Sequence, residues 1–197
     1  MPTTANKVKF NLKNVHYAIN NGDGTFTTPV AIPGAVNLSL EPQGESYVFY
    51  ADGVRYFEYA TNDGYEGDLE IALIPQSFRT AILKEILDSN QNLVEVDDVN
   101  LQDFALGFQI DGDQKETCFW FYDCTAARPT TSAKTKEAST EVDTETLSLT
   151  AKPDVNINVT SNGKTVHPVR IRSTEETTTA SWFSAVVTPN MQAVPAG

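Results

Sequence analysis

The chain has 197 residues, 40% hydrophobic and 20% charged, which predicts one globular domain. Its formal net charge of −12 argues against a nucleic-acid-binding function, because an acidic surface repels the phosphate backbone. The sequence has no apolar run of about 18 residues, as a membrane span would need, and the first ten residues lack the apolar core of a secretory signal. We therefore expect a soluble protein that folds in the cytoplasm.

The first part of the chain predicts short β-strands separated by turns. Strands are expected over 8–12, 15–19 and 25–30, with turn segments at 21–24 and 33–34. Apolar and polar residues alternate over 36–40 and again over 69–73, as in half-buried strands. The predicted fold class is mainly β.

A long aromatic hairpin is predicted over about 46–60. The segment 47–65, YVFYADGVRYFEYATNDGY, carries five of the seven tyrosines, and Asp52-Gly53 is a typical hairpin turn. Because side chains alternate across a strand, Val54 and Tyr56 are expected on one face and Arg55 and Phe57 on the other. Rings on both faces favour an assembly element, and the alternative is a central hairpin buried within one domain. The candidate subunit-interface residues are Tyr47, Phe49, Tyr50, Tyr56, Phe57, Tyr59 and Tyr65.

One segment predicts a helix over about 77–88. Its apolar residues, from Phe78 to Leu87, recur at spacings of three and four, with Ser77 as a possible N-cap and the segment 88–90 as a stop. We interpret the apolar stripe as part of the core.

The second half of the chain predicts further strands around two polar segments. Strands are expected over 93–96, 104–110, 117–125, 145–149, 155–160 and 166–171, and a closing strand around 182–187. The segment 128–140 predicts a mobile Ser/Thr-rich loop, and 189–197 a flexible tail. Cys118 and Cys124 lie six residues apart in one strand, about 20 Å, which is too far for a disulfide.

The sequence offers no recognisable catalytic, cofactor or metal site. The two histidines, His16 and His167, both lie in predicted strands, and the usual hydrolase and nucleotide-binding motifs do not occur. Asp111 and Asp113 resemble the start of a calcium loop, but Lys115 takes the next ligand position. We expect no enzyme and no cofactor.

The order of these parts resembles the major tail protein, or tail tube protein, family of long-tailed bacteriophages. The likeness covers about 8–153 and is most specific over 41–87. The likeness is carried by the aromatic hairpin, NDGYEGDLEI at 62–71, IP at 74–75 leading into FR at 78–79 and the helix, and TETL at 144–147.

The resemblance implies a β-sandwich or barrel-like tail tube fold with one flanking helix and no enzymatic activity. It implies a virion protein, made in the host bacterial cytoplasm, whose hexameric rings stack into the conduit for viral DNA ejection. Its partners would be copies of itself, with the tape measure and other tail proteins as further candidates. A negative lumen would let DNA pass without specific binding, although acidic residues also simply keep subunits soluble.

A second hypothesis is a monomeric carbohydrate- or ligand-binding β-sandwich module. In that case Tyr47, Tyr50 and Tyr59 would stack on sugar rings. Self-association distinguishes the two hypotheses, because the binding module would stay monomeric.

Overall fold

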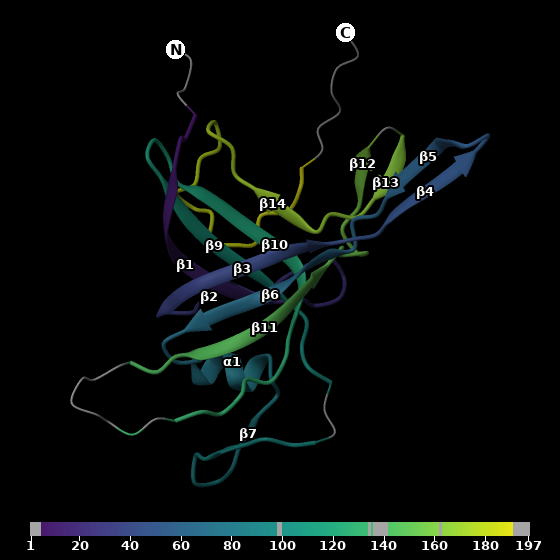
Figure 1. Ribbon diagram of the computed structural model, residues 1–197. Helices are drawn as coiled ribbons and strands as arrows, with labels where there is room; N and C mark the ends of the chain where they lie inside the picture. The colour runs from purple at the N-terminus through teal and green to yellow at the C-terminus, as the bar shows by residue number, and fades with distance from the viewer. Residues whose placement is uncertain (1–4, 98–99, 134, 136–141, 162, 191–197) are drawn as a thin grey trace.

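The computed structural model describes residues 5–97, 100–133, 135, 142–161 and 163–190 (Figure 1). The chain is mainly β with one short helix, as the sequence predicts. The helix has six residues, so it is not long enough to cross a membrane, and no other helix occurs in the described ranges. Residues 134 and 136–140 of the predicted loop and residues 191–197 of the predicted tail lie outside the described residues.

An antiparallel sheet of eight strands forms the body of the molecule. Seven of the strands follow the order β2-β1-β9-β10-β11-β6-β3, and β14 pairs with the remaining part of β10. Because β14 pairs with Phe119–Phe121 and β11 with Asp123–Ala126, the sheet forks along β10. The strands are β1 (Lys9–Ile19), β2 (Val30–Ala31), β3 (Ala35–Gln43), β6 (Gly64–Ile71), β9 (Phe104–Gly112), β10 (Thr117–Ala126), β11 (Glu145–Lys152) and β14 (Arg170–Arg172).

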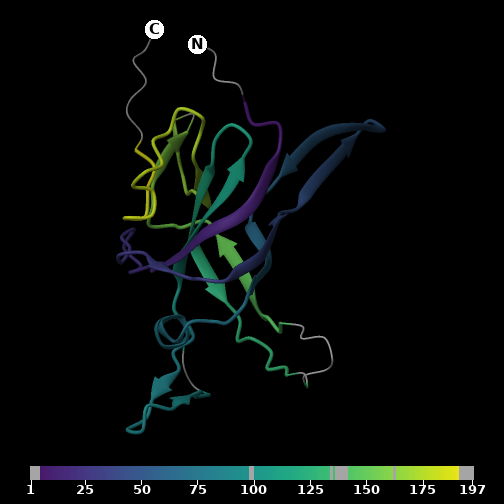
Figure 2. The same ribbon diagram turned by 90° about the vertical axis from the view of Figure 1, so that its left-hand side faces the viewer.

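Three two-stranded hairpins lie outside this sheet. The longest, β4–β5, projects far from the body, and Figure 2 shows β4–β5 and β7–β8 extending in different directions. The hairpins are β4 (Ser46–Ala51) with β5 (Val54–Ala60), β7 (Ile86–Leu87) with β8 (Leu93–Val94), and β12 (Val159–Ser161) with β13 (Lys164–Val166).

Several predicted strand boundaries are wrong. The segments 8–12 and 15–19 form one strand, β1, in which Asn11 and Asn14 adopt positive φ and interrupt the register with β9. The expected strand at 25–30 is reduced to the two residues of β2 and an isolated bridge at Phe26. No strand forms at 182–187, where turns carry Trp182 into a buried position.

The helix is shorter than predicted. Helix α1 spans Gln76–Ala81, and Pro75 occupies the N-cap position that the sequence assigned to Ser77. Ile82 is the C-cap of α1, and the chain turns after it, with Lys84 at a positive φ of 59°; Ile82 and Leu83 are both buried in the core. The apolar spacing therefore predicted the burial of Phe78, Ile82 and Leu83 correctly, but Ile86 and Leu87 form strand β7 and are exposed.

Two hydrophobic cores lie on opposite sides of β9 and β10. The first is enclosed by the curved sheet and α1 and contains Phe78, Phe104 and Phe121. The second lies under the C-terminal segment, where the Trp120 indole N–H donates to the carbonyl O of Trp182 (3.1 Å). Gly107 lies opposite Trp120 in β9, and a Cβ there would come within 2.6 Å of the indole ring.

Both cysteines are buried, and they form no disulfide with each other. Cys118 belongs to the second core and Cys124 to the first, although an even spacing in a regular strand would place them on one face. A register shift between Phe121 and Cys124 in the pairing of β10 with β9 accounts for the change of face.

Candidate assembly surface

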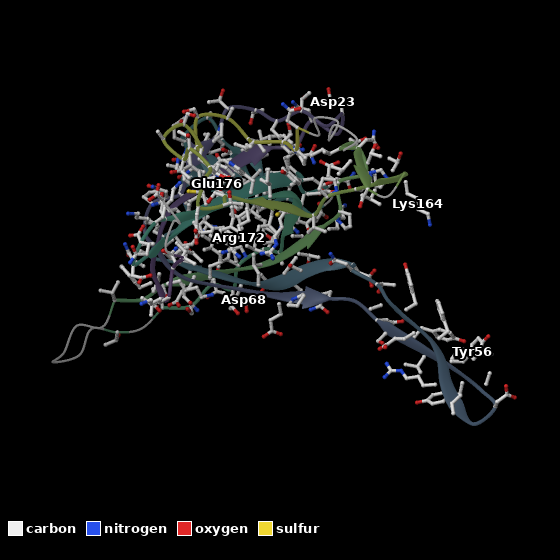
Figure 3. The ribbon with its side chains drawn as sticks, turned by 90° about the horizontal axis from the view of Figure 1, so that it is seen from above. Asp23, Tyr56, Asp68, Lys164, Arg172 and Glu176 are labelled. Atoms are coloured by element: carbon white, nitrogen blue, oxygen red, sulfur yellow. The ribbon has the colours of Figure 1, made fainter. Side chains whose placement is uncertain are left out.

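The β4–β5 hairpin extends two strands of the main sheet. Strand β3 continues into β4, and β5 returns into β6. Hydrogen bonds carry the pairing across the junction: the backbone N–H of Thr61 donates to the carbonyl O of Glu45 (2.8 Å), and that of Asp63 donates to the carbonyl O of Gln43 (2.9 Å). The hairpin therefore continues from β3 and β6 and projects beyond the main sheet (Figures 1 and 3).

The turn has the geometry that the sequence predicts. Asp52 and Gly53 both adopt positive φ, 52° and 76°, as a type I′ hairpin turn requires. Glycine takes this conformation without strain, and aspartate tolerates it better than most residues.

Most of the rings gather on one face of the hairpin. Tyr47 pairs with Tyr59 and Phe49 pairs with Phe57, and residues directly opposite each other share a face. We call these four residues the aromatic face.

The residues on the opposite face differ from those that strict alternation places there. Phe49 pairs with Phe57 but Tyr50 pairs with Arg55, so Tyr56 is the extra residue of a β-bulge. Arg55 consequently leaves the face of Phe57, where the sequence placed it, and forms an ion pair with Glu58.

The hairpin rings contact neither core of their own chain. Exposed fractions of the six rings range from 48% for Phe49 to 72% for Tyr56, and neither core cluster includes any of them. Figure 3 shows the hairpin extending away from the body, with Tyr56 well beyond it. This exposure excludes the alternative of a central hairpin buried on both faces.

Tyr65 lies apart from the other six candidate residues. It is half-buried at the start of β6, and its ring makes an edge-to-face contact with Phe121 (centroid distance 5.2 Å). The Arg170 guanidinium lies 5.0 Å from the centroid of the Tyr65 ring. Sequence analysis missed Arg170, although the alternation Arg170-Ile171-Arg172 does predict that both arginines share one face of a strand.

The polar residues singled out in the sequence have structural partners. His16 stacks on Phe183 at 4.8 Å, and His167 Nδ1 lies 3.1 Å from the carbonyl O of Ile157. Asp111 is bonded to Lys13 at 2.9 Å, and the backbone N–H of Lys7 donates to Asp113 at 2.8 Å. These bonds hold the pKa of both carboxyls below the ordinary value. Within the described ranges no group of three or more His, Cys, Asp or Glu side chains could hold a metal ion.

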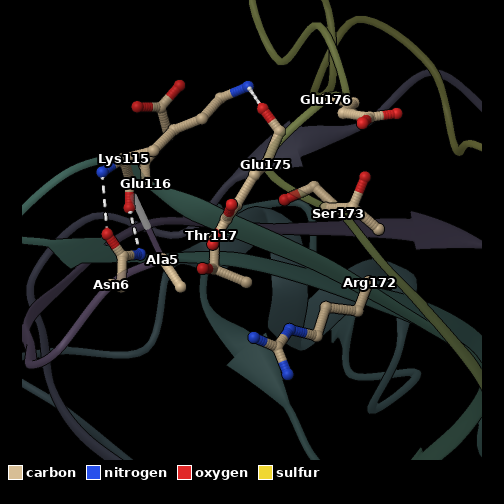
Figure 4. Close-up of a pocket in the computed structure, with 10 residues that line it drawn as sticks. Ala5, Asn6, Lys115, Glu116, Thr117, Arg172, Ser173, Glu175 and Glu176 are labelled. Atoms are coloured by element: carbon tan, nitrogen blue, oxygen red, sulfur yellow. Dashed lines mark hydrogen bonds between the residues drawn. The ribbon is translucent and has the colours of Figure 1, made fainter. Parts of the chain in front are cut away.

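A polar hollow of about 640 Å³ lies where the first described residues meet β10 and the segment 172–176 (Figure 4). The hydrogen-bond donors of Lys115 in this hollow bind acceptors of the same chain. The Lys115 ammonium donates to the carbonyl O atoms of Glu175 (2.8 Å) and Thr177 (2.7 Å), and Asn6 accepts from the backbone N–H of Lys115 (2.9 Å). We interpret the hollow as a structural junction.

Comparisons with known proteins provide little independent information. No family model matches the chain, and no curated protein matches it. A similar chain occurs in a solved structure described as the cryo-EM structure of the anti-feeding prophage (AFP) baseplate, 6-fold symmetrised. The match covers 90% of this chain and 100% of that chain, with 15% sequence identity and a TM-score of 0.49. At this TM-score the likeness carries no functional argument.

Proposed function

We propose that this chain is a structural subunit that assembles with copies of itself through the aromatic face of its β4–β5 hairpin. In the form that the family resemblance suggests, the subunits close into hexameric rings that stack as the tail tube of a long-tailed bacteriophage. The tube would conduct viral DNA during ejection. The observation that carries the proposal is a projecting hairpin whose four rings on one face are left outside both cores.

The proposal rests on the cost of leaving these rings in water. A large contiguous apolar patch is uncommon on a protein that stays monomeric. Burying an aromatic side chain is worth about 2 kcal/mol, so a neighbouring subunit that covers the aromatic face gains several kcal/mol. The pairing of β3 also supports assembly, because β3 pairs only with β6 among the described strands and its other edge can accept a partner.

The acidic composition agrees with a conduit function. A net charge of −12 disfavours tight contact with phosphates, so DNA would pass without specific binding. In this proposal the protein is a virion component assembled in the host cytoplasm, with the tape measure and other tail proteins as further partners. No enzymatic activity is proposed.

Removing two rings from the aromatic face tests the proposal. Phe49 and Phe57 are 48% and 54% exposed, so about half of each side chain remains to be covered. Phe49→Ser with Phe57→Ser should weaken each contact by about 2 kcal/mol, roughly 30-fold in the dissociation constant. The matched control is Leu73→Ser, because Leu73 is 69% exposed but lies outside the hairpin.

Sedimentation velocity over a concentration series, followed by electron microscopy, measures the effect. We expect rings or tubes from the natural chain and from the control, and a folded monomer from the double variant. Ordered tubes from the double variant at the same concentration would contradict the proposal.

The same experiment separates assembly from the binding-module hypothesis. The register places Tyr50 on the face opposite Tyr47 and Tyr59, so one flat sugar cannot stack on all three rings. A binding module would stay monomeric and change its fluorescence with an oligosaccharide panel. Self-association without such a response favours the structural subunit.

A further inference from the structure

The first core opens to solvent between β1 and β3. A hollow of about 440 Å³ lies at this opening. Phe10 and Val36, at 54% and 55% exposed, lie at its rim and remain largely uncovered. The apolar residues deeper in the hollow include Leu12, Leu38, Leu40, Phe108, Ile110 and Phe119.

Cations line this region, although the chain as a whole is acidic. A second hollow of about 400 Å³ shares Lys9, Ile110, Phe119 and Arg170 with the first. The linings of the two hollows contain no Asp or Glu. The cations that line the two hollows are Lys7, Lys9, Arg170 and Arg172. None of these four side chains forms an ion pair within the described residues.

The Arg170 guanidinium lies beside three aromatic rings at the opening. It lies 5.0 Å from the ring centroid of Tyr65, 5.8 Å from that of Phe119 and 5.7 Å from that of Phe121. The Arg170 residue itself is exposed. A partner that brings rings and carboxylates together would therefore find matching groups here.

The hairpin of the same chain type has this chemistry. Its aromatic face supplies the rings. Glu58 is already paired with Arg55, which leaves Glu45 and Asp52 as the other carboxylates of the segment 45–60. A cavity of about 150 Å³ holds one benzene molecule, so the 440 Å³ hollow has room for about two rings.

A chain cannot make this contact with its own hairpin. The hollow is lined by the first part of β3, whereas the hairpin continues from its end. Phe49 lies nine residues beyond Leu40, about 30 Å along extended backbone, on a hairpin that extends away from the body (Figure 3). The ladder from β3–β6 into β4–β5 prevents the hairpin from folding back.

We infer that the hollow between β1 and β3 receives the cross-strand pair Phe49 and Phe57 from the hairpin of a second copy, with Arg170 and Lys9 facing the hairpin carboxylates. This inference rests on the proposed function and names the receiving surface. The contact is head-to-tail, so its repetition closes a ring or grows an open filament.

Two variants, each defective on one surface, test the inference. The hairpin variant is Phe49→Ser with Phe57→Ser. The groove variant is Lys9→Glu with Val36→Asp, which places two carboxylates at the rim of the hollow. Its matched control is Lys164→Glu with Val166→Asp, the same substitutions at exposed positions of β13. Circular dichroism and thermal melting confirm that each chain is folded.

Each variant alone should be monomeric at concentrations where the natural chain and the control assemble. A mixture of the two should form a 1:1 heterodimer that grows no further, because one intact hairpin meets one intact groove. Sedimentation velocity with one chain labelled measures this directly, and we expect at least a 30-fold gain in affinity over either variant with itself.

Three outcomes would overturn the inference. If the groove variant assembles normally while the hairpin variant does not, the hairpin binds elsewhere and the proposed function stands. If both single-surface variants are monomeric and their mixture stays monomeric, the two surfaces do not bind each other. If both variants assemble normally, the proposed function fails together with the inference.

Discussion

Asp123 makes the stability of the fold depend on pH. It lies in β10, is only 8% exposed, and its Oδ1 atom has no hydrogen-bond partner in the described part of the chain. Lys152 lies opposite in β11, with its ammonium 3.6 Å from Asp123 Oδ2 and 3.8 Å from Asp103 Oδ2. Burial raises the pKa of Asp123 to about 6, and the neighbouring carboxylates of Asp103 and Asp154 add to the effect, against the lowering influence of Lys152.

The sign of the effect follows from this raised pKa. Between about pH 4 and pH 6 the folded chain keeps the Asp123 proton that the unfolded chain has lost. The contribution of Asp123 to stability is therefore greatest below pH 4 and is lost as the pH rises to 6. A rise of about two pKa units corresponds to at most about 3 kcal/mol.

Asp123→Asn removes the charge and keeps the shape. Below pH 4 the variant and the natural chain should be about equally stable. At pH 7 the variant should be more stable by about 1–2 kcal/mol, because the lost ion pair with half-exposed Lys152 offsets part of the gain.

Urea unfolding at pH 4, 5, 6 and 7 measures this difference, at concentrations low enough to keep the chain monomeric. Asp52→Asn is the control, since Asp52 is exposed at a turn position that asparagine also tolerates. A stability difference between natural chain and Asp123→Asn that does not change with pH would refute the reasoning.

The other predictions concern the two cores. Gly107→Ala should lower the free energy of unfolding in urea by about 1–3 kcal/mol and shift the tryptophan fluorescence, because the new methyl group displaces the buried Trp120 ring. An unchanged urea midpoint would mean that β9 and β10 can move apart to admit the methyl group without cost. Burial raises the pKa of the Cys118 thiol to about 11, and it also raises the pKa of Cys124. Neither thiol should react with a disulfide reagent at pH 8 until the chain is unfolded, when both react, and rapid reaction of the folded chain would contradict the packing.

Local signals in the sequence determined much of the β architecture. Alternation over 36–40 predicted β3, and Leu69 and Ile71 of the predicted strand 69–73 lie in β6, although Leu73 lies beyond its end and is exposed. Asp52-Gly53 predicted the turn of the hairpin. These predictions were confirmed because turn geometry and strand alternation depend on neighbouring residues. The length of the helix was wrong because burial of Ile82 and Leu83 can be achieved by a turn as well as by a helix.

Strand alternation alone did not assign the residues of the hairpin to their correct faces. Tyr56 is the extra residue of a bulge in β5, which places Arg55 on the face opposite Phe57. No local sequence pattern predicts which residue becomes the extra residue of a bulge. The same kind of shift in β10 separates Cys118 from Cys124. A single extra residue changes the side of every residue beyond it, so register must be known before faces can be assigned.

By itself, the sequence determined that a ring-rich hairpin would exist and that the chain would be mainly β, since both follow from short-range backbone and side-chain preferences. Only the tertiary structure decided that the hairpin stands clear of the body. It also brought Lys9, Val36 and Arg170, which are distant in sequence, to one opening. Strand pairing sets such distances, because the closure of a sheet depends on all of its strands together.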